Sequence, residues 1–122
     1  MKIRICDDSI RLRLDRAEVD HIAMDQSVRC VTHFPQGNEF AYCLSVGGDA
    51  TAAEFADGCI TVTLAAASAR HWATTETEVS IIVDCPLEEG FLKLLIEKDF
   101  ECLDPREGED QSNRFKNPKA TA

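Results

Sequence analysis

An internal repeat restricts the fold of this chain more than any other feature of its sequence. The stretch ICDDSIRLRLDRAEVDHIA at residues 5–23 aligns without a gap with FADGCITVTLAAASARHWA at residues 55–73, at an offset of 50. Unrelated sequences of this length would share about one identity. This pair shares six: Asp7/Asp57, Ile10/Ile60, Leu14/Leu64, Ala17/Ala67, His21/His71 and Ala23/Ala73. A second group matches at an offset of 51: Val28/Val79, Pro35/Pro86, Phe40/Phe91 and Leu44/Leu95.

The spacing of apolar residues predicts the elements of each repeat. Residues 2–14 alternate between apolar and basic side chains on both sides of CDDS, which predicts a β-hairpin. The sequence DRAE at residues 15–18 is a capping box, so a helix is expected to run from there to about Gln26. Two strands around the turn-forming sequence PQGNE complete the unit. The second repeat has the same order, with its helix at about residues 65–74.

A ββαββ unit alone cannot bury its sheet face, so the two units are expected to associate. We predict an α+β fold: two tandem ββαββ repeats, at about 2–46 and 52–99, related by a pseudo-two-fold axis. They would form a mostly antiparallel eight-stranded sheet or flattened barrel with two helices. Two packed sheets are the alternative. Residues 1–103 are expected to be a single domain, and residues 104–122, where the periodicity ends, a C-terminal tail.

The net charge of −9 argues against a general nucleic-acid binder, because such proteins neutralise phosphates with Lys and Arg.

No apolar run approaches the roughly 20 residues that span a bilayer, and the N-terminal sequence lacks the apolar segment of a secretion signal. A bacterial-type cytoplasmic protein without membrane association is therefore expected. The oligomeric state remains open.

The six cysteines include no CxxC pair, and we expect reduced, buried thiols, with Cys30 and Cys43 filling the core. A disulfide or metal ligation remains an alternative, and the hairpin register leaves a Cys30–Cys43 bond open. His21 and His71 fall on the polar faces of their helices. This placement favours two exposed histidines over a shared metal or acid–base site.

Catalytic signatures are absent from the sequence. It contains no glycine-rich phosphate loop, no GxSxG and no HExxH. We therefore assign no catalytic residue, expect no cofactor, and consider an enzyme less well supported than a binding protein.

The first hairpin carries a basic ladder that the second repeat lacks. If Ile5 faces Ile10, then Arg4 faces Arg11 and Lys2 faces Arg13, and opposed like charges destabilise a hairpin unless something neutralises them. We favour the last strand lying beside this hairpin, with the acidic row Glu97, Asp99 and Glu101 as counter-charge. As alternatives, an external anion could neutralise the basic ladder, or water alone could solvate it.

Two stretches carry a resemblance: SIRLRLDRAEV near the N-terminus and, more specifically, the C-terminal pattern EKDFxCLxPR, then ED, then FxNP. Over nearly its full length the chain resembles a family of small bacterial proteins of unknown function. The resemblance implies a defined role for a tail that composition alone would leave as a flexible segment, and it implies no activity. The tail residues that carry the motif include Arg106, Glu109, Asp110 and Phe115.

The leading hypothesis is a non-enzymatic binding module for a protein or an anionic small ligand. Its candidate contacts are the basic ladder, Lys2, Arg4, Arg11 and Arg13, and the tail motif with Arg106, Glu109, Asp110 and Phe115. The alternative is a small-ligand or metal-binding barrel, perhaps an enzyme, with Cys102, Asp104, Glu109 and Asp110 as ligands.

Overall fold

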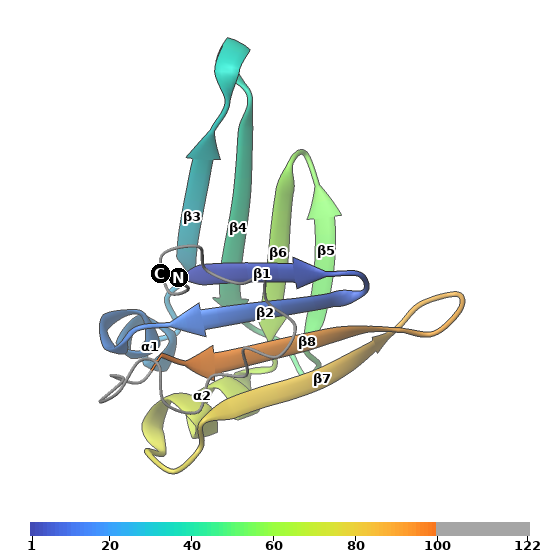
Figure 1. Cartoon of the computed structure of the whole chain (residues 1–122). Helices are drawn as coiled ribbons and strands as arrows, with labels where there is room; N and C mark the ends of the chain where they lie inside the picture. The colour runs from blue at the N-terminus through green and yellow to red at the C-terminus, as the bar shows by residue number, and fades with distance from the viewer. Residues whose placement is uncertain (100–122) are drawn as a thin grey trace, which may run out of the picture.

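The structure, a computed structural model, describes residues 1–99. Two helices and eight strands follow one another in the order β-β-α-β-β-β-β-α-β-β (Figure 1). Their bounds are β1 Lys2–Cys6, β2 Ser9–Leu14, α1 Arg16–Ala23, β3 Val28–His33, β4 Glu39–Val46, β5 Ala52–Ala56, β6 Cys59–Leu64, α2 Ala66–Thr74, β7 Ser80–Pro86 and β8 Phe91–Lys98. A short 3-10 turn, Pro35–Gly37, connects β3 to β4.

The strands form two separate four-stranded sheets. Sheet A has the order β1-β2-β8-β7, and sheet B has the order β3-β4-β6-β5. In each sheet two antiparallel hairpins are joined by a central parallel pair, β2 with β8 and β4 with β6. The α+β class with two helices is thus as predicted, whereas the single eight-stranded sheet or flattened barrel is wrong. The sheets do not close, and the alternative of two sheets describes them.

The helices explain why the strands divide in this way. Helix α1 leads from β2 in sheet A to β3 in sheet B, and α2 leads from β6 in sheet B back to β7 in sheet A. The two hairpins of each half therefore belong to different sheets, and each sheet contains one hairpin from either half. Periodicity identifies hairpins but does not say in which sheet each one lies.

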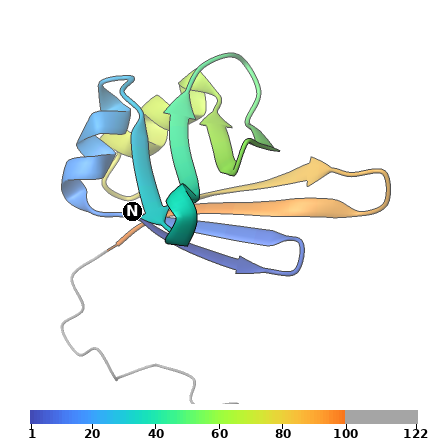
Figure 2. The ribbon, with the colours of Figure 1, turned by 90° about the horizontal axis from the view of Figure 1, so that it is seen from above.

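Figures 1 and 2 show how the sheets are arranged. Sheet A runs across the front of Figure 1, sheet B stands upright behind it, and the two helices lie together at one end. The hairpins of both sheets extend away from the helices, those of sheet A sideways and those of sheet B upward. None of the described helices is long and apolar enough to cross a bilayer.

One hydrophobic cluster holds the sheets and helices together. Trp72 of α2 is 1% exposed, and its indole Nε1 donates a hydrogen bond to the Val79 carbonyl at 3.0 Å. The cluster draws on both sheets and both helices, with Leu12, Leu14, Ile22, Leu44, Val62, Leu64, Leu94 and Ile96 as further members. The face of each sheet that contributes to this cluster is its inner face, and the opposite one is its outer face.

Helix α1 begins as the sequence predicts and ends earlier. The Asp15 carboxylate accepts from the Glu18 amide, and the Glu18 carboxylate accepts from the Asp15 amide, so the capping box is confirmed. The helix ends at Ala23 because Asp25 adopts a left-handed conformation with φ 58°. The Gln26 amide then donates to the His21 carbonyl at 2.9 Å, which is a Schellman-type ending. Gln26, the predicted end of the helix, therefore lies beyond it and is exposed.

The hairpins β3–β4 and β7–β8 do not correspond residue by residue at the sequence offset of 51. Leu44 is fully buried, whereas Leu95, its match in sequence, pairs with Arg11 on the outer face of sheet A. A shift of one residue moves a strand side chain to the opposite face. Cys43 lies opposite Arg29, next to buried Leu44, and so points to the outer face of sheet B. The prediction that Cys43 fills the core is therefore wrong.

Candidate anion-binding site

The basic residues of the first hairpin lie together on the outer face of sheet A. The predicted register is confirmed: Lys2 pairs with Arg13, Arg4 with Arg11 and Ile5 with Ile10. Because β8 pairs with β2, Ser9 lies opposite Lys93, and a fifth cation joins the same face. We call Lys2, Arg4, Arg11, Arg13 and Lys93 the basic face.

Lys93 was missed at the sequence level, although a signal for it was present. The predicted acidic row of the last strand begins at Glu97 and continues toward the C-terminus. Lys93 stands four residues before Glu97, at the same period of two, and so had to share its face once β8 was placed beside the hairpin.

Carboxylates of β8 and of the residue that follows it neutralise one end of the basic face. Arg13 donates to Glu97 Oε1 through Nε at 2.9 Å and through Nη2 at 2.8 Å. Arg11 lies 3.6 Å from the same oxygen, and Lys2 lies 3.4 Å from Asp99. The predicted placement of the last strand and its acidic row is therefore confirmed for Glu97 and Asp99. Glu101 lies outside the described residues.

The other end of the basic face keeps an excess of positive charge. Arg4 and Lys93 form no ion pair within residues 1–99. Asp84 is the cross-strand partner of Lys93 on β7, but its carboxylate does not come within 4.0 Å of the ammonium. Like charges opposite one another, as at Arg4 and Arg11, cost stability. An external anion would therefore bind most favourably at this end of the basic face, where the positive charge has no carboxylate partner.

A depression of about 340 Å³ lies at this end, and we call it the sheet A depression. Its lining combines two guanidinium groups, an ammonium, a hydroxyl, a thiol and an aliphatic side chain, from Arg4, Arg11, Lys93, Ser9, Cys6 and Leu95. Guanidinium groups bind carboxylate and phosphate oxygens through paired N–H donors, and Lys adds a point charge. No described His or carboxylate hydrogen-bonds to Ser9 or Cys6 as a base would. The depression therefore offers groups for binding an anion.

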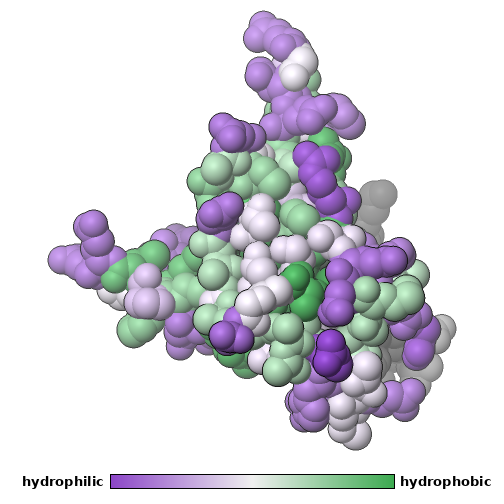
Figure 3. All heavy atoms as spheres, turned by 180° about the vertical axis from the view of Figure 1, so that it is seen from behind, coloured by the Kyte–Doolittle hydropathy of each residue, from purple (hydrophilic) through white to green (hydrophobic). Residues whose placement is uncertain are grey.

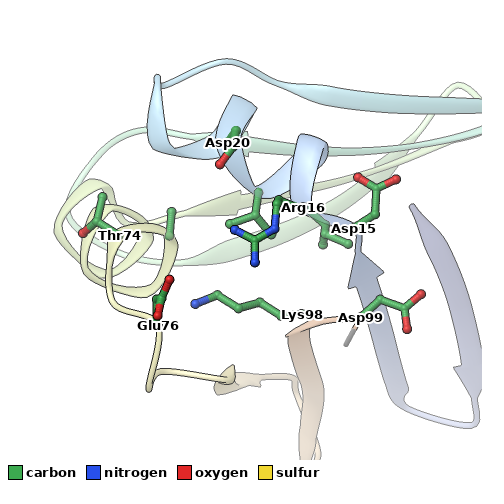
Figure 4. A pocket seen from close by; sticks show the side chains of 10 residues that line it. Asp15, Arg16, Asp20, Thr74, Glu76, Lys98 and Asp99 are labelled. Carbon is green, nitrogen blue, oxygen red and sulfur yellow. The ribbon is translucent and has the colours of Figure 1, made fainter. Parts of the chain in front are cut away.

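A second, larger depression of about 600 Å³ lies between the two helices and the end of β8 (Figure 4). Arg16 extends into it from α1, and Lys98 extends from β8 toward Glu76. Lys98 is already engaged, because its Nζ donates to the Thr75 carbonyl at 2.9 Å and lies 5.5 Å from the Trp72 ring centroid. The lining has both signs of charge, with four carboxylates, Asp15, Asp20, Glu76 and Asp99, around the two cations. It is a less selective place for an anion than the sheet A depression.

The histidines and cysteines do not assemble a metal site in the described part of the chain. No group of three or more His, Cys, Asp or Glu side chains is placed to hold a metal ion there. His21 and His71 are both exposed, as predicted, and His71 Nε2 lies 3.4 Å from Glu78. The five described cysteines are free thiols, so Cys30 and Cys43 are not bonded; none is fully buried, contrary to prediction.

Sheet B presents a different outer face. Burial raises the pKa of the Cys43 thiol, Cys59 nearby adds to this, and Arg29 opposes it. A raised pKa lowers the fraction of reactive thiolate at neutral pH. The view from behind in Figure 3 shows mainly white to green side chains, of intermediate to hydrophobic character, at the centre of the molecule, and hydrophilic ones at the hairpin tip above. Arg29 is the only Lys or Arg on the four strands of sheet B, so the concentration of cations is particular to sheet A.

The tail residues named from the sequence lie outside the described residues. They are Arg106, Glu109, Asp110 and Phe115 of the binding hypothesis, and Cys102 and Asp104 of the metal-binding alternative. Their roles stay predictions.

A family model described as "Family of unknown function (DUF7009)" matches residues 1–119. The expectation of an uncharacterised family is thereby confirmed, while the C-terminal motif stays a prediction. Neither a curated protein nor a solved structure matches the chain.

Proposed function

Because the chain belongs to DUF7009, a family to which no function is assigned, we propose a function from its own surface: it is a binding module that holds an anionic group in the sheet A depression. One observation carries this proposal. Three cations surround the depression, and two of them, Arg4 and Lys93, have no carboxylate partner among residues 1–99. In a chain with a net charge of −9, such a concentration of uncompensated cations is a local exception.

A comparison of the two halves supports this proposal. We infer that the halves are tandem ββαββ repeats related by a pseudo-two-fold axis. In support, β1–β2 and β5–β6 have the same register at an offset of 50, and exchanging the halves converts one strand order into the other. The positions of Arg4 and Arg11 are then occupied by Glu54 and Thr61 in sheet B. The equivalent hairpin in sheet B thus folds without these arginines. The basic face is therefore not required by the scaffold, which supports a role in binding.

We propose further that the domain of residues 1–103 works with its tail. The family model continues to residue 119, which supports a role for the tail motif, with Arg106, Glu109, Asp110 and Phe115, as a second contact to the partner. The five described cysteines are free thiols, which supports a reducing compartment, and we propose the cytoplasm.

Calorimetric titration with inorganic phosphate and with citrate tests the proposed site. We expect saturable binding that weakens with added salt, because the cations are solvent-exposed. The double variant Arg4→Gln/Lys93→Gln should weaken binding at least about tenfold, since a hydrogen bond to a charged group contributes about 1.5–3 kcal/mol.

The matched control is Arg29→Gln/Arg70→Gln, which removes the same amount of charge at exposed positions away from sheet A. Binding should stay within about twofold of the wild type in this control. Equal losses in both double variants would reduce the effect to net charge and overturn the proposed site.

A further inference from the structure

The strand next to the sheet A depression, β1, is an edge of its sheet. Its only partner within residues 1–99 is β2. Hydrogen-bonded and non-hydrogen-bonded pairs alternate along an antiparallel ladder, so about half of the backbone groups of an edge strand point away from its neighbour. Such an edge can accept a further strand.

The two edges of sheet A differ in how well they could accept a strand. On β7, Pro86 has no N–H to donate, and Asp84 would repel an acidic strand. On β1, every residue of Lys2–Cys6 has its N–H, and Ile5 is 53% exposed. Of the two edges, β1 is the open one.

The side chains of β1 define what kind of strand would fit. Lys2, Arg4 and Cys6 point to the outer face, whereas Ile3 and Ile5 point to the inner face. Charged residues on an edge deter neutral or basic strands, but they pair favourably with acidic residues directly opposite. Arg4 is also part of the sheet A depression, so an acidic side chain beside it would reach Arg11 and Lys93 as well.

We propose that β1 binds an extended segment of a partner protein in which acidic and apolar residues alternate. The segment adds a fifth strand to sheet A, its carboxylates lie beside Lys2 and Arg4, and its apolar side chains extend the inner face beyond Ile5. This inference rests on the proposed function, because the depression supplies the counter-charge, and it identifies the anion as a peptide carboxylate. Backbone pairing supplies affinity, and the alternation supplies specificity.

Fluorescence anisotropy with three capped, labelled peptides tests this proposal on the full chain. The core of the first is Glu-Val-Glu-Val-Glu. The second has the same composition in blocks, Glu-Glu-Glu-Val-Val, and the third is the alternating peptide N-methylated throughout its core, which keeps the charges but removes the backbone donors. We expect the alternating peptide to bind, and the other two to bind at least about tenfold more weakly. Alternate amides of β1 should become protected from hydrogen exchange in the complex, while those of β3, β5 and β7 should not.

The outcomes separate this inference from the function on which it rests. If the block or N-methylated peptide binds as tightly as the alternating one, or if the alternating one does not bind, strand addition to β1 is overturned. If the control peptides bind as tightly as the alternating one but bind more weakly to Arg4→Gln/Lys93→Gln, the anion site is still supported. If all binding is unchanged in that double variant, the proposed function itself fails.

Discussion

At the scale of single residues, Glu18 is the carboxylate that pairs with the α-amino group of Met1 and helps to keep it charged. The amino group forms an ion pair with the Glu18 carboxylate, whose side chain is 18% exposed. Burial by itself would lower the pKa of the amino group, but the hydrogen bond and charge of Glu18 outweigh it, and the pKa lies above its usual value of 8.0. The same carboxylate caps α1, so Glu18 connects the start of β1 to the helix.

Glu18→Gln should separate these two roles. Gln can replace Glu in a capping box, so the helix cap is kept while the charge is lost. We expect a loss of about 1 kcal/mol of unfolding free energy at pH 7, measured by denaturant unfolding.

The pH dependence provides the check on this assignment. The amino group has a raised pKa when folded, so its contribution is complete below pH 8.0 and disappears as the pH rises through the folded-state value. The difference between wild type and Glu18→Gln should therefore shrink above pH 8.0. A difference that stays constant into the alkaline range would assign the loss to the helix cap instead.

At the scale of elements, the contact between the first hairpin and β8 depends on Glu97. Two arginines share this carboxylate, Arg13 at 2.8 Å and Arg11 at 3.6 Å, while its side chain is 16% exposed. A double-mutant cycle of Arg13→Gln and Glu97→Gln should give a coupling of about 0.5–1 kcal/mol. Glu97→Gln alone should cost more than Arg13→Gln alone, because it leaves both arginines without a partner.

The Arg70–Asp25 pair offers a matched control for this cycle. Its charged atoms are 3.8 Å apart, and both side chains are more than half exposed. We expect a coupling near zero for this pair. If the two cycles give equal couplings, the ion pairs of Glu97 do not help to join β8 to the hairpin.

These elements also show what the sequence could predict. Alternation located every hairpin, the capping box located the start of α1, and the unanswered charge of Arg4, Arg11 and Arg13 placed the last strand beside the first hairpin. The end of α1 was missed because Asp25 has no strong sequence preference for the left-handed conformation, which Gly favours. The face of Cys43 was missed because identities at an offset of 51 do not reveal a shift of one residue between paired strands.

At the scale of the whole molecule, the division into two sheets could not be derived from the repeat. Each helix transfers the chain between sheets, and the parallel pairs β2–β8 and β4–β6 join strands far apart in sequence. The alternation of apolar residues within one hairpin does not identify such distant neighbours; only the charges of the first hairpin and the last strand indicated the β2–β8 pair. The candidate site depends on the same distant pairing. Lys93 lies beside Arg4 and Arg11 only because β8 pairs with β2.

Amide NMR spectra of the isotope-labelled protein, recorded during titration with inorganic phosphate, test the anion site most directly. We predict saturable chemical-shift changes at Arg4, Ser9, Arg11 and Lys93, which surround the sheet A depression, and none at Arg29 or Arg70. Changes confined to Arg16 and Lys98 would instead assign anion binding to the depression between the helices. That result, or a spectrum unchanged by phosphate, would contradict the proposal.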